Sequence, residues 1–266
     1  MLSIFIDLIG RLLPEPQAGL LLGILFGVQT QLPRDLYEAL ITTGTIHVVV
    51  LSGQNIAILT AFLSEVLLIF GRKTSILLTL LAIGMYVWFV GFEPPIIRAA
   101  IMASLILFSV YFGKQSWSLL TLFFTVSMML FVNPQFIEDR SFQLSVAATL
   151  GILLFGPKET MKKSGLRHQL FHYFKFNLQT TLSAQLFTTP LILYHFHRIS
   201  LVAPVANVLI AWTISPIMIF GFLTVLAGLI WEPFGILAGF LAYAPVSFLL
   251  LVVQLTAQIP FASFNW

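Results

Sequence analysis

Charged residues are scarce in this chain, and cysteine is absent. Only 9% of the 266 residues are charged, whereas a soluble domain carries about 25%. Hydrophobic residues make up 59% of the chain, so too little polar surface remains to face water. Long apolar runs recur along the chain, which is typical of membrane helices. The absence of cysteine excludes disulfides and thiolate metal sites.

Motifs for catalysis are missing as well. The sequence has no Walker A loop, no GxSxG pattern and no HExxH pattern, which argues against nucleotide hydrolysis and against the common hydrolase sites. A pair of intramembrane aspartates cannot be assembled, because the only aspartates are Asp7, Asp35 and Asp139. The histidines lack nearby carboxylates and are weak metal ligands. We therefore expect no enzyme activity, no cofactor and no metal site.

The apolar segments predict an all-α fold, a polytopic transmembrane helical bundle with about seven to eight membrane segments. Short loops that carry charge, proline or glycine separate these segments. Two of the segments are short for a bilayer that needs about 20 residues per span. The predicted membrane helices are 46–70, 75–91, 96–112, 116–131, 141–155, 177–195, 203–230 and 235–258.

Residues 1–45 differ from the rest of the chain. They contain a short amphipathic start, a break at Pro14–Pro16 and an apolar stretch, Ala18–Val28, that is too short to span a bilayer alone. The stretch Leu32–Thr43 is amphipathic, with Pro33 placed at a helix start. Such segments usually lie in the plane of the membrane interface. We therefore divide the chain into interfacial segments, 1–45, and a transmembrane domain, 46–266.

Lysine and arginine in the loops predict the orientation. With eight spans, Arg72, Lys73, Lys114 and the basic loop 158–167 fall on one side of the membrane. These loops belong in the cytoplasm by the positive-inside rule. The basic loop is also a candidate docking site for a cytoplasmic partner, although an ordinary positive-inside loop is the favoured explanation.

Arg98 is the most informative polar residue, because it lies inside a predicted membrane helix. A charge at membrane depth is costly unless it has a partner or a water-filled cavity. Arg98 could reach the headgroups or pair with Glu93. Alternatively it faces inward, where its guanidinium can bind phosphate oxygens.

Three further groups of polar residues lie in predicted helices. Asn177, Thr181 and Gln185 recur at helical spacing in 177–195, Gln143 lies in the SFQLS run, and Asn207 begins another helix. Hydrogen bonds between helices would explain such residues. Several polar faces in one apolar bundle are also typical of a lined transport path.

A fourth polar cluster precedes the first long span. It contains His47 and Ser52, which lie between Gly44 and Gly53, and Asn55, which follows Gly53. The two glycines permit close helix approach or local unwinding. His47 and Asn55 are about two helical turns apart, on roughly one face. We interpret His47 as a structural hydrogen-bonding residue rather than a catalytic one.

At these clusters the sequence resembles the competence domain of the ComEC family, the inner-membrane channel of bacterial natural transformation. Two positions depart from the family pattern: Asn55 replaces a second histidine, and Ser141 replaces a glycine. The resemblance follows the chain in order through Thr43–His47 with Leu51–Gly53, Glu93–Met102, Asn133–Pro134 with Phe142–Ser145, Ser183–Gln185 with Thr189–Leu191, and Pro204–Leu209.

The resemblance implies a multi-pass protein of the bacterial inner membrane that passes single-stranded DNA into the cytoplasm. It implies as partners an extracytoplasmic DNA receptor and nuclease domain, a cytoplasmic helicase-like motor and membrane lipids, and it leaves a homo-oligomer open. Family members usually add OB-like and metallo-β-lactamase-like domains, which we do not find in this sequence.

On that interpretation, His47, Ser52, Asn55, Arg98, Gln143, Thr181, Gln185 and Asn207 lie along the DNA path. Two alternatives remain. A small-solute transporter would show a closed site and internal repeats. A non-transporting membrane scaffold for extracytoplasmic nuclease domains would show a packed bundle without a path.

Overall fold

The computed structural model describes residues 2–158 and 166–265, and almost all of its regular structure is helical. Its elements are α1 (Leu2–Leu12), α2 (Gln17–Phe26), α3 (Arg34–Thr42), η1 (Ile46–Val48), α4 (Gly53–Val66), η2 (Leu67–Phe70), α5 (Arg72–Val90), α6 (Pro94–Tyr111), α7 (Ser118–Val132), η3 (Pro134–Glu138), α8 (Arg140–Phe155), α9 (Leu166–Phe196), β1 (Arg198–Ser200), α10 (Ala203–Ile230), α11 (Glu232–Ala257) and β2 (Ser263–Asn265). The all-α membrane bundle predicted from the sequence is confirmed.

Five helical stretches in the described residues are long and apolar enough to cross a membrane: α4 with η2, α5, α6, α10 and α11. The predicted count of seven to eight spans is not confirmed. Helices α7 and α8 are apolar but short, as their sequences indicated. The predicted span 177–195 lies inside the much longer α9, which also contains basic and amide side chains and is not among the five.

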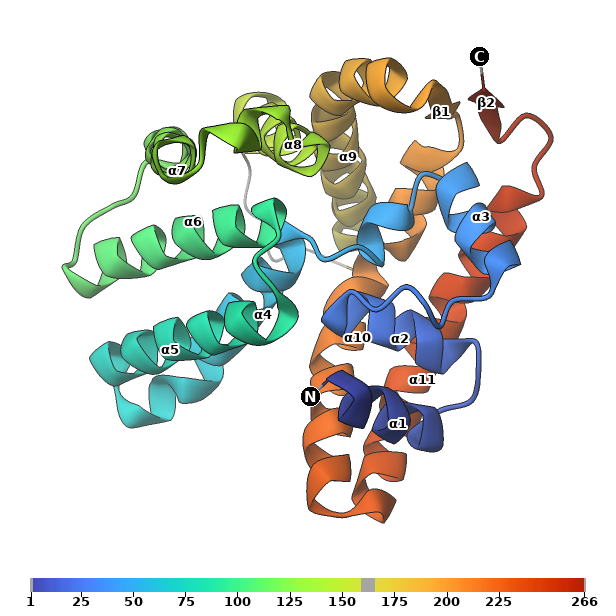
Figure 1. Ribbon diagram of the computed structural model, residues 1–266, viewed down its shortest axis with the longest axis horizontal. Coiled ribbons are helices and arrows are strands. Elements are labelled where there is room, and N and C mark those ends of the chain that lie inside the picture. Colours follow the sequence, from blue (N-terminus) through green and yellow to red (C-terminus); the bar gives the residue numbers. More distant parts are fainter. Residues whose placement is uncertain (1, 159–165, 266) are drawn as a thin grey trace.

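Helices α10 and α11 form a long hairpin, seen in orange and red in Figure 1. Helices α1, α2 and α3 pack against this hairpin, and together these five helices form what we call the hairpin region. Its core is the larger of two apolar clusters and includes Leu21, Ile24, Ile217 and Val253. Every residue of α2 from Ala18 to Phe26 is buried. This helix therefore lies inside the protein.

Small residues bring the helices of the hairpin region close together. A Cβ atom added to Gly235 of α11 would lie 2.6 Å from the Cα of Gly228 in α10. A Cβ atom added to Gly221 would lie 2.7 Å from a methyl group of Leu21 in α2. Because van der Waals packing drives helix association in membranes, such close approach stabilises the region directly.

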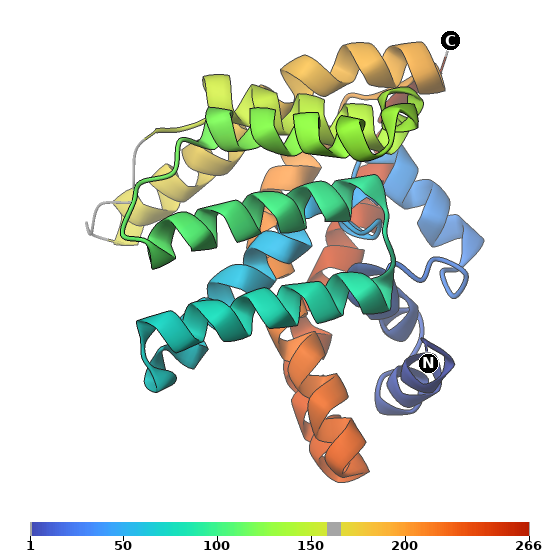
Figure 2. The same cartoon turned by 60° about the vertical axis from the view of Figure 1, so that its left-hand side comes forward.

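The remaining helices, which we call the α4–α9 region, surround a smaller apolar cluster that α4, α5 and α6 supply. None of the described residues of α7, α8 and α9 belongs to either cluster. Figure 2 shows α4, α5 and α6 as a stack beside the hairpin, with α7, α8 and α9 along one end. The second region is therefore held together by fewer buried apolar side chains.

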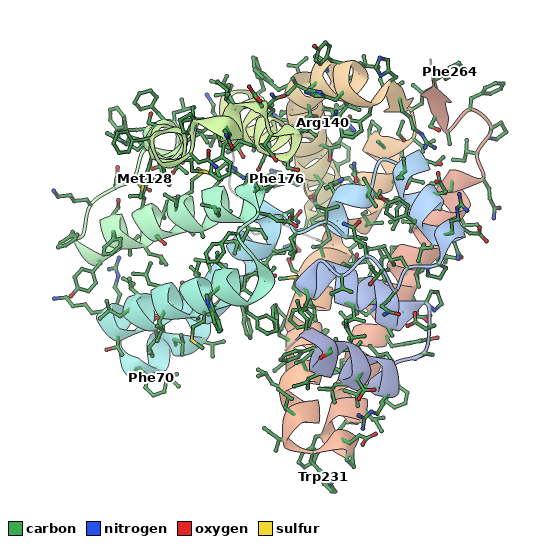
Figure 3. All side chains as sticks on the ribbon, viewed as in Figure 1. Phe70, Met128, Arg140, Phe176, Trp231 and Phe264 are labelled. Carbon is green, nitrogen blue, oxygen red and sulfur yellow. The ribbon has the colours of Figure 1, made fainter. Side chains whose placement is uncertain are left out.

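Large apolar side chains cover the outside of the protein. Phe70, Met128, Trp231 and Phe264 lie at its periphery in Figure 3, and each is more than half exposed. Exposing so many large apolar side chains to water is unfavourable, whereas contact with lipid is favourable. The exposed residues thus agree with a membrane environment.

The sequence prediction of one continuous helix over 46–70 is wrong. The chain forms the short η1 at Ile46–Val48, continues without helix through Val49–Ser52, and begins α4 only at Gly53. The non-helical segment packs against α2, since Val49 contacts Gly23 and a Cβ atom on Gly27 would meet Leu51 at 2.5 Å. These tertiary contacts, which local hydropathy does not report, take the place of helical hydrogen bonds. The division of the chain at residue 45 stays a prediction.

Candidate functional site

Two helix ends meet near the centre of the molecule. Helix α2 ends at Gly27, which has the left-handed conformation (φ 71°) typical of a helix end. Its last carbonyls are buried and need hydrogen-bond donors. The Asn55 Nδ2 donates to the carbonyl oxygen of Ile24 at 2.9 Å, and the Tyr86 hydroxyl donates to that of Leu25 at 2.8 Å. The end of α2 is thus held by side chains of α4 and α5.

Helix α4 begins beside this point without a side-chain cap. Ser52 occupies the N-cap position in an extended conformation, but its hydroxyl makes no capping hydrogen bond. Instead the Ser52 hydroxyl donates to Asn55 Oδ1 at 3.2 Å. The structure therefore brings the predicted residues Ser52 and Asn55 together, with Asn55 only 2% exposed. Both orient the junction between α2 and α4.

Arg98 lies in the second turn of α6 and is only 6% exposed. Its Nε donates to the Ser145 hydroxyl of α8 at 2.9 Å, and its Nη1 lies 3.2 Å from the sulfur of Met102. A Cβ atom added to Gly53 would lie 2.7 Å from Arg98 Nη2, so the guanidinium faces the first residue of α4. Arg98 thus joins α4, α6 and α8 at one point.

This buried guanidinium has no counter-charge within the described residues. No carboxylate lies within ion-pair distance of it, and Glu93 is exposed at the helix start. The pairing with Glu93 that the sequence left open is therefore absent, and the guanidinium is buried within the protein rather than extended to its surface. A buried charge without a partner is strongly unfavourable. The arrangement is suited to binding an anion.

The polar stripe on α9 lies half-buried beside α8. Thr181 and Gln185 are both partly exposed, and neither has a side-chain hydrogen-bond partner in the described part of the chain. Other members of the stripe bond to their own helix, as Asn177 does to Tyr173 and Thr188 does to Ala184. Interhelical hydrogen bonding therefore does not account for Thr181 and Gln185.

Gln143 makes a contact that sequence reasoning missed. Its Oε1 lies 2.8 Å from Nε2 of His195, near the end of α9, and its Nε2 donates to the carbonyl of Ile137 at 2.7 Å. The predicted residue is thus tied to the end of the bundle rather than to Arg98. The sequence signal was the pair of histidines, His195 and His197, at the end of a polar helix.

No hydrogen bond in the described part of the chain joins His47 or Asn207 to the Arg98 cluster. His47 is exposed on η1, with its Nδ1 3.1 Å from the carbonyl oxygen of Gly44. Asn207 lies in the first turns of α10, and its buried Oδ1 has no hydrogen-bond partner among the described residues. The predicted site therefore consists of one central cluster and several separate polar positions.

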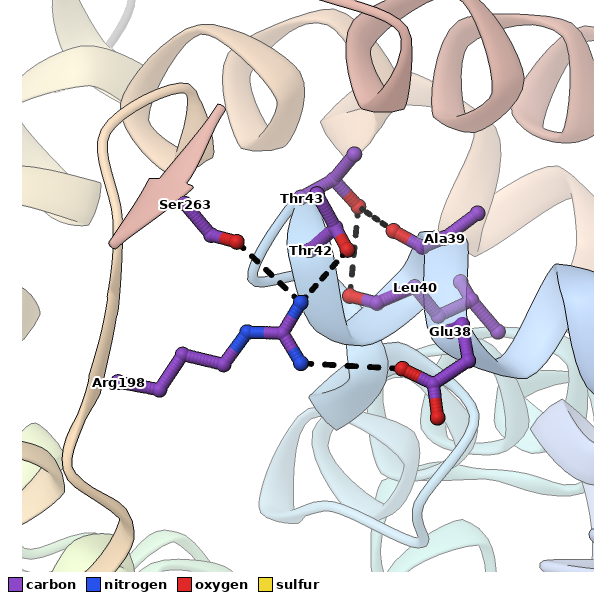
Figure 4. Close-up of polar contacts among 7 residues, drawn as sticks. All are labelled: Glu38, Ala39, Leu40, Thr42, Thr43, Arg198 and Ser263. Atoms are coloured by element: carbon purple, nitrogen blue, oxygen red, sulfur yellow. Dashed lines mark hydrogen bonds and ion pairs between the residues drawn. The ribbon is translucent and has the colours of Figure 1, made fainter. Parts of the chain in front are cut away.

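Arg198 was missed as an organising residue. Figure 4 shows its Nη2 donating to the hydroxyls of Thr42 at 2.8 Å and Ser263 at 3.2 Å, while Nη1 lies 3.8 Å from Glu38. Through these contacts β1 holds both α3 and β2, which pairs with β1 in antiparallel register. The hydroxyl of Thr43 bonds back to Ala39 and Leu40 within the same turn.

Comparison with known proteins places the chain in a family. ComE operon protein 3 of Bacillus subtilis (strain 168) is 27% identical over 206 residues, which cover 77% of this chain and 26% of that protein. An uncharacterized protein of Aquifex aeolicus (strain VF5) is 38% identical over 135 residues, which cover 50% of this chain and 32% of that protein. The chain thus matches about a quarter to a third of the length of these relatives.

No solved structure matches the chain. The family model described as "Competence protein" matches residues 24–266, which is most of the sequence. This match includes the Arg98 cluster, the polar stripe of α9 and the start of α10. The chain therefore belongs to the Competence protein family, as its resemblance to ComEC proteins predicted.

Proposed function

We propose that this chain forms the inner-membrane path through which one DNA strand enters the bacterial cytoplasm during natural transformation. Membership of the Competence protein family and the apolar helices support this function. The observation that carries it is the buried Arg98, whose guanidinium has no carboxylate partner in the described residues. A passing phosphodiester supplies the missing negative charge.

The chemistry of a DNA backbone fits this position. Each nucleotide carries one negative charge, and a guanidinium can donate two parallel hydrogen bonds to phosphate oxygens. A single well-placed arginine holds a phosphate without the tight binding of a densely basic channel. Transit requires contacts that are weak and repeated, as in ion conduction.

The separate polar residues extend the path beyond Arg98. Thr181, Gln185 and Asn207 retain polar atoms without side-chain partners in the described residues, and these can take the place of water around the strand. Exposed His47 on η1 adds a further polar position, as does the Gln143–His195 pair, which joins the start of α8 to the end of α9. In this proposal Ser52 and Asn55 keep the helix ends in place beside Arg98.

The chain requires partners for directed transport. We assign the driving force to a cytoplasmic helicase-like motor, because the sequence contains no nucleotide-binding loop. An extracytoplasmic receptor and nuclease domain would deliver the single strand. The relatives are about three to four times longer than the matched segment, so such functions belong either to further domains or to separate chains.

Uptake of labelled DNA tests the proposal. Cells lacking the chromosomal copy are complemented with the wild type, Arg98→Ala, Gln185→Leu or the control Arg72→Ala, which removes an exposed cation outside the site. We expect the deletion and Arg98→Ala to retain surface-bound DNA without internalised strand, Gln185→Leu to reduce internalisation, and Arg72→Ala to behave like the wild type.

Immunoblotting of the membrane fraction shows whether each variant inserts to the same level. Wild-type internalisation in correctly inserted Arg98→Ala would remove Arg98 from the path. Wild-type internalisation in the deletion strain would reject the channel altogether, in favour of a solute transporter or a scaffold.

A further inference from the structure

The first turn of α4 offers unused hydrogen-bond donors. The first N–H groups of an α-helix have no acceptor within the helix, and Ser52 provides no side-chain cap. The N–H groups of Gly53 and Gln54 therefore remain available. The helix contains 14 residues, so its dipole also places a partial positive charge at this end.

Arg98 is aimed at the same place. Its side chain is nine-tenths buried, its Nη2 has no hydrogen-bond partner in the described residues, and this atom faces Gly53. A guanidinium against the positive end of a helix is unfavourable unless an anion lies between or beside them. Two independent features, the uncapped helix and the unpaired buried cation, thus both favour binding of an anion at this place.

We propose that Arg98 and the first-turn N–H groups of α4 form a seat for one phosphodiester group. The guanidinium supplies the full charge, and the α4 N–H groups supply short directional bonds to oxygen, as helix N-termini do for phosphate. Because the ligand is taken to be DNA, this seat rests on the proposed function.

Gly53 and Ser145 have distinct roles in the seat. Gly53 lets the guanidinium lie against the start of α4, because a Cβ atom there would lie 2.7 Å from Nη2 and 3.3 Å from the Cβ of Ala99. Ser145 is a positioning residue, since its hydroxyl accepts from Nε and leaves Nη2 directed at α4. The absence of a side chain at Gly53 therefore allows the guanidinium and the first N–H groups of α4 to bind the same ligand.

Binding to the purified protein in detergent micelles tests the seat separately from transport. The probes are a fluorescent eight-nucleotide oligothymidylate, inorganic phosphate as its competitor, and phosphatidylglycerol added to the micelles to detect a lipid phosphate. The variants are Gly53→Ala, Arg98→Gln and Arg98→Lys. Gly84→Ala is the matched control, because a Cβ atom there meets nothing within 4 Å.

We expect Gly53→Ala and Arg98→Gln to weaken oligonucleotide binding roughly 10- to 100-fold, the effect of losing one or two charge-assisted hydrogen bonds. Arg98→Lys should weaken it less, and Gly84→Ala not at all. Phosphate should compete in the wild type and fail to compete for the residual binding of Gly53→Ala. If Arg98→Gln does not fold, Gly53→Ala decides, because it retains the arginine.

Unchanged oligonucleotide affinity in folded Gly53→Ala would overturn the seat, even if Arg98→Ala abolishes uptake and so preserves the proposed function. Conversely, binding that depends on Gly53 together with normal uptake by Arg98→Ala would retain the seat and reject its role in transport. If phosphatidylglycerol raises the thermal unfolding temperature of the wild type and no oligonucleotide binds, the seat belongs to a lipid phosphate. That result would overturn the DNA ligand.

Discussion

The hairpin region and the α4–α9 region are built in opposite ways. In the hairpin region, glycines bring α10, α11 and α2 into close contact, and the core is almost entirely apolar. In the α4–α9 region, Arg98 is buried without a counter-charge, and Thr181 and Gln185 have no side-chain partners among the described residues. Of the proposed path, Arg98, Thr181 and Gln185 thus lie where apolar packing is weakest, whereas Asn207 belongs to α10 of the hairpin region.

This difference separates a framework from a path. Close van der Waals packing stabilises helices in a membrane and leaves no space for a ligand. Polar groups without protein partners destabilise the fold unless water or a ligand satisfies them. We infer that the hairpin region holds the protein together and that the α4–α9 region carries the function. Substitutions in the two regions should therefore have different consequences.

The largest effect on stability should come from the hairpin itself. Gly235→Val places a side chain against the backbone of Gly228 and the methyl groups of Leu12, and such overpacking costs roughly 1–3 kcal/mol. The expected result is a lower thermal unfolding temperature in detergent and less folded protein in the membrane. Gly84→Val on the exposed face of α5 serves as control. Equal unfolding temperatures for both variants would contradict the framework role.

A somewhat smaller effect should come from the junction of the two regions. Asn55→Leu retains the branched shape of the side chain but removes the donor to the buried carbonyl of Ile24. An unsatisfied buried carbonyl costs about 2 kcal/mol, so the unfolding temperature should fall. The neighbouring Gln54→Leu, at an exposed position, should leave it unchanged. The account of the α2 end fails if both leucine variants unfold alike.

Much of this fold could be predicted from the sequence, because hydropathy and helix length are local properties. The long spans α5, α6, α10 and α11 lie close to their predicted bounds, and α7 and α8 were identified as short. The break at Val49–Ser52 was not predicted. It depends on contacts with Gly23 and Gly27, which lie more than twenty residues earlier in the sequence.

The site was predicted in composition but not in arrangement. Arg98 was identified because a charge inside an apolar helix is costly, and Asn55 and Ser52 because they flank a glycine. Their partners could not be predicted, since Ser145 comes beside Arg98, and the carbonyl of Ile24 beside Asn55, only through helix packing. A polar residue in an apolar helix carries no signal of which helix it will face.

The smallest effect should come from the Arg198 contacts at the end of the hairpin region. Arg198→Lys loses the simultaneous bonds to Thr42 and Ser263, because lysine has no planar fork. The ion pair with Glu38 is largely exposed, so the change in stability should be about 0.5 kcal/mol. Faster amide hydrogen exchange at Ser263 and Phe264, with little change in unfolding temperature, is the expected result. Unchanged exchange would show that β2 is held independently of Arg198.

Crosslinking a strand during its transit tests most directly that DNA passes Arg98. The chain contains no cysteine, so Ser145→Cys introduces a single thiol beside the guanidinium, and Ser127→Cys introduces one on the exposed face of α7. The probe is single-stranded DNA carrying thiol-reactive groups on its phosphates, supplied to competent cells. We predict a crosslink to Ser145→Cys and none to Ser127→Cys. Continued uptake with no crosslink at Ser145→Cys, or equal crosslinking at both positions, would contradict a DNA path past Arg98.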